Sequence, residues 1–216
     1  MLQKRIDAIT KDLPSSIKLI AVSKTHTADE INAAIDCGIT DIGENKVQEI
    51  LSKYDSVKKV NWHFIGHLQT NKVKQIIDKV YMIHSVDSLH LAEEISKRAT
   101  HEVNILIQVN AAGEEQKFGV SPDQVLDLAN SVKDLPNIKL RGLMHIAPAA
   151  DNPEDVRVYF KKVKNIFDKL KPQFGEDFDT LSMGMSNDYK VAIEEGATCV
   201  RIGTAIFGER NYSKSQ

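Results

Sequence analysis

The chain has 216 residues, a formal net charge of −2 and a hydrophobic fraction of 42%. These values are typical of one globular domain, and they exclude a strongly charged protein of the kind that binds nucleic acid or membrane surfaces. Two cysteines are too few for a disulfide scaffold, no apolar run is long enough to span a membrane, and the mixed polar and apolar first residues predict a cytoplasmic protein without a signal peptide.

Short apolar runs alternate along the chain with longer amphipathic stretches. The first amphipathic segment, residues 2–12, predicts a helix ahead of the first strand. Later helices are predicted to begin at Ser121-Pro122 and Asn152-Pro153, where a capping residue precedes a proline. The eight apolar runs that predict strands are residues 19–22, 41–43, 62–66, 82–85, 104–109, 140–145, 180–182 and 199–202.

Eight strand–helix repeats in one chain are typical of an α/β fold with a parallel sheet. We therefore predict a single (β/α)8 TIM-type barrel with an extra N-terminal helix. No linker-like segment divides the chain, so residues 1–216 are expected to form a single domain. In such a barrel the chemistry lies at the C-terminal ends of the strands.

Lys24 follows the first predicted strand directly. A lysine at a barrel rim, desolvated by its neighbours, can form an imine with an aldehyde. An isolated lysine at a strand end is more often a plain surface residue, so this interpretation needs support from elsewhere in the chain.

That support comes from the segments Leu181-Ser-Met-Gly-Met-Ser186 and Val200-Arg-Ile-Gly-Thr204. Each reads as a strand that runs into a turn, and we expect Ser186 to cap the seventh helix while its hydroxyl meets a phosphate. Gly203 and Thr204 would add backbone N–H groups and a hydroxyl after the eighth strand, where barrels of this kind usually bind phosphate. A plain helix cap and a simple turn glycine are the alternatives.

Arg201 lies two residues before Gly203 and so points to the same face of its strand. On that face its guanidinium could approach the ring nitrogen of a pyridine cofactor and oppose protonation there. The alternative is a salt bridge with an acid such as Glu44. Asn45, after the second strand, could place an amide beside the same cofactor, or it could cap the next helix.

Three histidines lie near the predicted rim. His67 and His145 follow strands, and their roles are left open because acid–base chemistry depends on geometry. His63 lies inside a strand and is interpreted as a hydrogen-bonded packing residue. The two cysteines, Cys37 and Cys199, are read as small buried residues, and no clustered ligands predict a metal site.

Six motifs between residues 19 and 209 closely resemble the pyridoxal phosphate homeostasis proteins. They are Ala21-Val-Ser-Lys24, Ile42-Gly-Glu-Asn45, Trp62-His-Phe-Ile-Gly66, Arg141-Gly-Leu-Met144, Leu181-Ser-Met-Gly-Met-Ser186 and Val200-Arg-Ile-Gly-Thr-Ala-Ile-Phe-Gly208. The resemblance implies a barrel like the N-terminal domain of alanine racemases, which holds pyridoxal 5′-phosphate (PLP) as an imine.

By motif match, Lys24 carries the imine and Arg201 faces the ring nitrogen. Ser186, Gly203 and Thr204 bind the phosphate. Asn45 lies near the ring. The sequence departs from the family pattern at Thr70, where serine is usual, and at His145, where a small residue is common.

The related racemases use a second, β-rich domain that supplies a tyrosine opposite the lysine. This chain ends at Gln216, soon after the eighth repeat, so we expect an open site without substantial turnover. The predicted function is storage, protection or delivery of PLP in vitamin B6 homeostasis, with effects on amino-acid and keto-acid balance. PLP-dependent apoenzymes are possible recipients, nucleic acid and membrane are not expected as partners, and a monomer is favoured.

Two other functions remain open. One is an amino-acid racemase in which Lys24 works with His145 or His67 as the second base. The other is a barrel that binds a different phosphorylated metabolite without an imine, in which case replacing Lys24 would leave ligand binding nearly intact.

Overall fold

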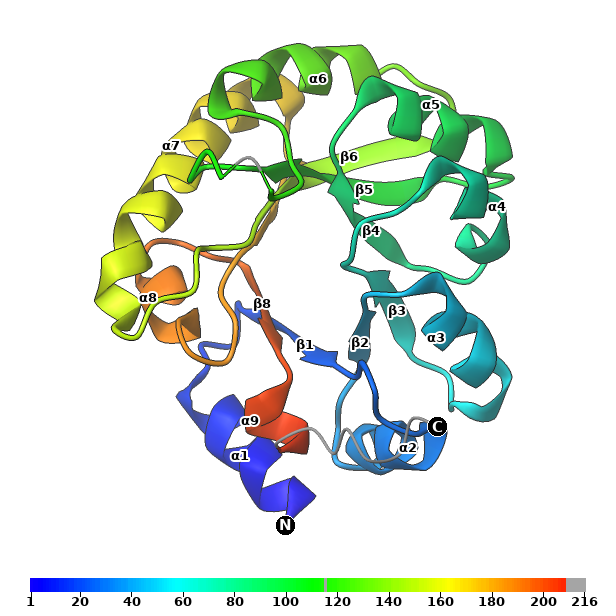
Figure 1. Ribbon diagram of the computed structural model, residues 1–216, viewed down its shortest axis with the longest axis vertical. Coiled ribbons are helices and arrows are strands. Elements are labelled where there is room, and N and C mark those ends of the chain that lie inside the picture. Colours follow the sequence, from blue (N-terminus) through cyan, green and yellow to red (C-terminus); the bar gives the residue numbers. More distant parts are fainter. Residues whose placement is uncertain (115, 209–216) are drawn as a thin grey trace.

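The computed structural model describes residues 1–114 and 116–208 and shows a closed barrel of parallel strands surrounded by helices (Figure 1). Each strand pairs with the next in chain order, and β8 closes the ring on β1. The strands are β1 (Lys18–Val22), β2 (Asp41–Glu44), β3 (Asn61–Phe64), β4 (Met82–Val86), β5 (Val103–Val109), β6 (Ile138–His145), β7 (Thr180–Ser182) and β8 (Cys199–Ile202). The predicted (β/α)8 barrel is confirmed; residues 209–216 of the predicted single domain lie outside the described residues.

The helices follow the strands around the ring, and the predicted N-terminal helix is α1 (Leu2–Asp12). The others are α2 (Ala28–Asp36), α3 (Val47–Lys53), α4 (Val73–Ile76), α5 (Leu89–Arg98), α6 (Val125–Val132), α7 (Arg157–Phe174), α8 (Tyr189–Glu194) and α9 (Thr204–Phe207). None of the described helices is long and apolar enough to cross a bilayer.

Two predicted helix starts are displaced. The prolines at 122 and 153 open short 3₁₀ turns, η3 (Pro122–Gln124) and η4 (Pro153–Val156), and the α-helices begin after them. Two further 3₁₀ turns are η1 (Tyr54–Ser56) and η2 (Thr70–Lys72). Proline suits the first turn of either helix type because its missing N–H has no intrahelical partner there, so the sequence located the start but not the helix type.

Strand register decides which residues face the helices and which fill the barrel. Ala21 pairs with Ile42, and Ile42 pairs with Trp62, and all three belong to the apolar core between strands and helices. Side chains alternate along a strand, so their neighbours Gly43 and His63 point into the barrel.

The barrel interior holds an unusual number of polar groups. One small apolar cluster, Met82, Leu106 and Met144, fills part of it. The remainder includes buried polar residues in place of the branched apolar side chains that dominate most barrels of this type: His63, His84, Ser182 and Arg201.

Candidate functional site

A cavity of about 470 Å³ lies where several strands end. Its walls come from the segments after β1, β5, β6, β7 and β8, together with η4. The volume lies within the range of roughly 300–1,000 Å³ that is common for small-molecule sites. Because the walls belong to loops at the C-terminal ends of the strands, the cavity is where a barrel of this class places its chemistry.

Five of the six site residues predicted from the sequence line this one cavity: Lys24, Ser186, Arg201, Gly203 and Thr204. They come from β1, β7 and β8 and the loops that follow, which closure of the barrel brings together. Asp188 is the single carboxylate among the described lining residues. Lys24, Arg201 and Lys117 make the wall favourable for an anion.

Ser186 and Gly203 are already joined across the cavity wall. The Gly203 N–H donates a hydrogen bond to Ser186 Oγ over 3.3 Å, which connects the loop after β7 to the loop after β8. Thr204 begins the short helix α9, whose first N–H groups have no partner within the helix. The two loops thus bring hydroxyl and amide groups to one place, as a phosphate requires.

The predicted capping role of Ser186 is wrong. Helix α8 begins at Tyr189, and its N-cap is Asp188, not Ser186. The Asp188 carboxylate instead accepts a hydrogen bond from the Met185 N–H at 2.6 Å and shapes the turn ahead of the helix. Ser186 lies in that turn, and its Oγ accepts from the Gly203 N–H while its own O–H can still donate to a ligand.

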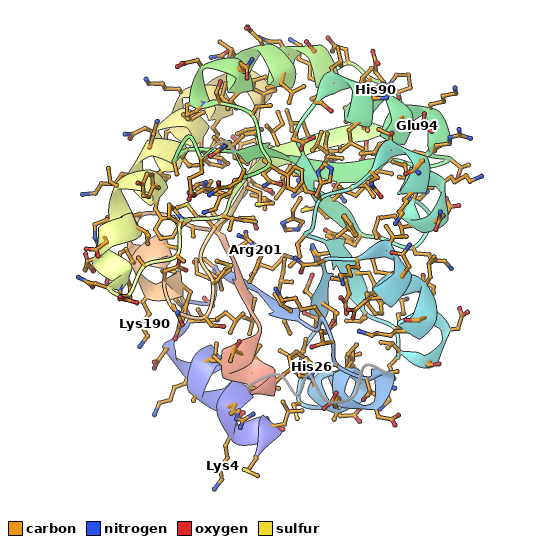
Figure 2. The ribbon with its side chains drawn as sticks, viewed as in Figure 1. Lys4, His26, His90, Glu94, Lys190 and Arg201 are labelled. Carbon is orange, nitrogen blue, oxygen red and sulfur yellow. The ribbon has the colours of Figure 1, made fainter. Side chains whose placement is uncertain are left out.

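Arg201 is 3% exposed and reaches the interior of the barrel, and it lies inside the ring of strands in Figure 2. Its Nη1 donates to Ser182 Oγ at 2.6 Å, and its Nη2 donates to the backbone carbonyl of His145 at 2.8 Å. Burial lowers the pKa of the guanidinium, and the nearby Asp188 partly opposes that effect. These two hydrogen bonds hold the guanidinium of Arg201 in one orientation at the cavity wall.

The alternative of a salt bridge between Arg201 and Glu44 is wrong. Glu44 lies on the same face of β2 as Ile42, toward the helices, whereas Arg201 points into the barrel. The Glu44 carboxylate accepts hydrogen bonds from Ser23 Oγ at 2.7 Å and Lys53 Nζ at 3.0 Å. Burial raises the pKa of Glu44 despite the lysine.

Asn45 lies at the end of β2 and is not among the residues that line the cavity. Its side-chain oxygen is buried and has no hydrogen-bond partner among the described residues. It does not cap α3, whose N-cap is Lys46. A β-carbon at Gly66 would lie 2.1 Å from the Asn45 carbonyl, so glycine allows these two loops to touch.

His67 and His145 do not line the cavity, whereas His26, two residues after Lys24, does. His67 pairs with Asp87 at 3.5 Å and stacks on Phe118 with ring centroids 3.7 Å apart. His145 is buried, its Nδ1 lies 2.9 Å from the Val109 carbonyl, and its Nε2 has no described partner. A second base must reach the reacting atoms, so neither position favours the racemase alternative.

Sequence reasoning missed two charged residues of the wall, Lys117 and Asp188. Lys117 follows β5 in a long loop, and its place after a strand was the available signal. Asp188 was visible only as part of an expected helix start. The interpretation of His63 as a hydrogen-bonded packing residue is confirmed, because its Nε2 lies 2.8 Å from Asp41 Oδ1.

The amino-acid sequence of this chain is similar to a family model and to several known bacterial proteins. The sequence model of the alanine racemase N-terminal domain matches residues 1–211. A pyridoxal phosphate homeostasis protein of Aquifex aeolicus (strain VF5) is 50% identical over 200 residues, which cover 90% of this chain and 88% of the Aquifex protein. The chain belongs to the pyridoxal phosphate homeostasis family. The Escherichia coli (strain K12) member is 41% identical over 210 residues, covering 93% of this chain and 89% of that protein.

Solved structures of the same family agree with the fold. PipY of Synechococcus elongatus PCC7942 with PLP bound is 32% identical, covers 96% of this chain and 100% of its own, and superposes with a TM-score of 0.87. An alanine racemase of Clostridium difficile 630 shows the fold alone, at 17% identity, with 97% of this chain and 56% of the racemase covered and a TM-score of 0.76. The homeostasis proteins of Aquifex aeolicus and Escherichia coli, together with PipY, confirm the resemblance carried by the sequence motifs.

Proposed function

We propose that this member of the family binds PLP as an imine of Lys24 and serves in its storage, protection or delivery. The observation that carries the proposal is the meeting of Lys24, Ser186, Arg201, Gly203 and Thr204 at one cavity. PLP supplies an aldehyde that condenses with a primary amine. PLP bound to PipY and the names of the curated relatives support the same ligand.

The residues present fit the three parts of this cofactor. Lys24 supplies the amine, and the phosphate suits the O–H of Ser186, whose Oγ is held by the Gly203 N–H, together with the first N–H groups of the helix that begins at Thr204. Arg201 suits the ring nitrogen because a buried guanidinium offers donors and opposes protonation of the atom it faces. The placement of Asn45 near the ring stays a prediction, because Asn45 does not line the cavity, although its buried side-chain oxygen has no partner among the described residues.

Arg201 also argues against two kinds of PLP chemistry, aminotransfer and decarboxylation. A pyridine nitrogen kept unprotonated is a poor acceptor of electrons, and the chemistry of aminotransfer and decarboxylation depends on that acceptor. We therefore propose little or no turnover, with a role in amino-acid and keto-acid balance that follows from PLP supply. Delivery to apoenzymes and residence in the cytoplasm remain predictions.

The test is to add PLP to the purified protein, reduce with borohydride and locate the adduct by peptide mapping. We expect an imine absorption band and a reduced adduct on Lys24. Lys24→Ala and Lys24→Arg should both lose the adduct, and the arginine variant keeps the positive charge without the amine. Lys190→Ala, which changes an exposed lysine that does not line the cavity, is the matched control.

Three outcomes contradict the proposal. An adduct that persists in Lys24→Arg would place the imine elsewhere. Absence of an adduct in the unaltered protein, with retained binding of inorganic phosphate, would favour the barrel for another phosphorylated metabolite. Conversion of L-alanine to D-alanine by the PLP-loaded protein, lost in Lys24→Ala, would restore the racemase alternative.

A further inference from the structure

A chain of hydrogen bonds crosses the barrel interior from the cavity to the opposite end of the strands. Arg201 Nη1 lies 2.6 Å from Ser182 Oγ, which lies 3.0 Å from His84 Nδ1. His84 Nε2 lies 2.9 Å from His63 Nδ1, and His63 Nε2 lies 2.8 Å from Asp41 Oδ1. The five buried residues come from β8, β7, β4, β3 and β2, and Asp41 is the first residue of its strand.

The two ends of the chain determine the hydrogen positions between them. Arginine can only donate, and a carboxylate can only accept. With neutral imidazoles, His63 must donate from Nε2 to Asp41, so its Nδ1 accepts from the Nε2–H of His84. The Nδ1 of His84 then accepts from the Ser182 hydroxyl, whose oxygen accepts from Arg201. Every donor points toward Asp41.

The protonation states agree with this arrangement. Burial lowers the pKa of both His63 and His84, which keeps the imidazoles neutral. Burial alone would raise the pKa of Asp41, but hydrogen bonds from His63 and Thr40 outweigh it and hold that pKa well below its usual range. Lys18, whose Nζ lies 3.4 Å from Asp41 Oδ1, also favours the carboxylate.

Arg201 needs such support because it is buried without an ion pair to any described carboxylate. Asp188 and Cys199 favour its charged form but do not pair with it at salt-bridge distance. A buried charge without compensation is costly. The aligned hydrogen bonds connect its positive charge to the negative charge of Asp41, and cooperative polarisation along such a chain strengthens each bond.

We infer that Ser182, His84, His63 and Asp41 are positioning residues that hold Arg201 charged and oriented toward the ring nitrogen of the cofactor. The inference rests on the proposed function, because that ring nitrogen is present only if PLP is the ligand. None of the four lines the cavity, so they act through Arg201 and not by touching the ligand.

The test is a double-mutant cycle read out as PLP affinity. Ser182→Ala removes one acceptor of a charged donor and should weaken PLP binding by about tenfold. Asp41→Asn keeps the size of the side chain and removes its charge, and it should weaken binding in the unaltered protein. In the Ser182→Ala background it should add nothing, because the chain is already broken.

Ser85→Ala is the matched control. Ser85 follows His84 on β4, is fully buried and has a hydroxyl without a described partner. Ser85→Ala therefore removes a buried serine oxygen, as Ser182→Ala does, but one that is not part of the chain of hydrogen bonds. This variant should bind PLP as the unaltered protein does, and Asp41→Asn should keep its full effect in that background. Equal effects of Asp41→Asn in the Ser182→Ala and Ser85→Ala backgrounds would overturn the inference.

A second readout needs no PLP. Long-range proton–nitrogen spectra of the apo protein should show His63 and His84 as neutral tautomers with the proton on Nε2, and a charged or Nδ1-protonated ring in either would overturn the inference. If Ser182→Ala does not fold, Asp41→Asn and these spectra decide the question. Failure of the unaltered protein to bind PLP would remove the proposed function and, with it, the orientation of Arg201 toward a ring nitrogen. PLP binding with an additive cycle would instead remove this inference alone and leave the proposed function standing.

Discussion

His145 shows how the interior of this barrel treats an ionisable side chain. It is 1% exposed, and its Nδ1 donates to the Val109 carbonyl. Burial, with a smaller contribution from the charge of Arg201, lowers its pKa from 6.5 to about 4. As the pH falls below 6.5, the imidazole of His145 therefore binds a proton in the unfolded chain but not in the folded protein.

The sign of the resulting pH dependence follows from that difference. Between the two pKa values the unfolded state holds more protons, so stability falls as the pH decreases. Between about pH 7 and about pH 5, we expect the unfolding free energy of the unaltered protein to fall by about 2 kcal/mol more than that of His145→Gln. Chemical denaturation at the two pH values measures it.

His90→Gln is the control for that measurement, because it makes the same substitution at an exposed histidine of α5. If the unfolding free energy changes equally between the two pH values in His145→Gln and in the unaltered protein, then His145 takes up its proton in the folded state too, which contradicts the prediction. The change is confined to a residue that lies outside the cavity lining, so it separates stability from ligand binding.

Strand β6 carries an irregularity that explains one sequence motif. Its register with β5 shifts between Ile105 and Leu106, so that Leu106 pairs with Gly142 and Arg141 is the extra residue. Gly142 has a φ of 145°, and a β-carbon there would lie 1.9 Å from the Thr180 carbonyl of β7. The glycine of the Arg141-Gly-Leu-Met144 motif thus lets β7 approach β6 at the bulge.

Gly142→Ala should destabilise the protein by about 3 kcal/mol or more, because backbone of the neighbouring strand must move. Gly38→Ala is the matched control: Gly38 also has a positive φ, 96°, but no atom lies within 4 Å of the place that an added β-carbon would occupy. Gly38→Ala should lower the unfolding free energy by about 1 kcal/mol, from backbone strain alone. Similar denaturation midpoints for the two variants would contradict the steric argument.

The molecule as a whole presents its large exposed apolar side chains singly. Among the described residues they lie on different helices and loops around the barrel: Met1, Leu51, Tyr81, Leu89, Phe118, Leu126, Val158 and Met185. Scattered apolar residues of this kind are normal on monomers, whereas a stable oligomer usually needs a contiguous patch.

We therefore expect a monomer of 24.1 kDa by light scattering coupled to size exclusion, both with and without PLP. Addition of PLP in large excess over its dissociation constant should raise the unfolding free energy, by about 2.7 kcal/mol at a hundredfold excess. Lys24→Ala should lose most of that increase. Twice the monomer mass at micromolar concentration would show that an interface exists which the apolar surface does not reveal.

Much of the fold was predictable because its signals are local. The alternation of apolar runs and amphipathic stretches located all eight strands to within about two residues and the N-terminal helix at residues 2–12. The positions of Lys24, Ser186, Gly203 and Thr204 just after strands predicted their meeting at one rim, because parallel strands of a barrel end on the same side. Helix starts were less certain, since proline suits α- and 3₁₀-turns alike.

Other features depend on which distant residues meet when the ring closes. A salt bridge between Arg201 and Glu44 was the alternative that the sequence left open. Opposite strand faces separate the two residues, and Arg201 donates a hydrogen bond to Ser182 instead. The hydrogen bonds from Arg201 to Asp41 join five strands, and no local pattern indicates them. The amino-acid sequence alone therefore settled the barrel, its rim and the family, because periodicity and turn chemistry act over a few residues. Tertiary structure alone decided the partners of the buried charges, because register and closure choose which side chains share the interior.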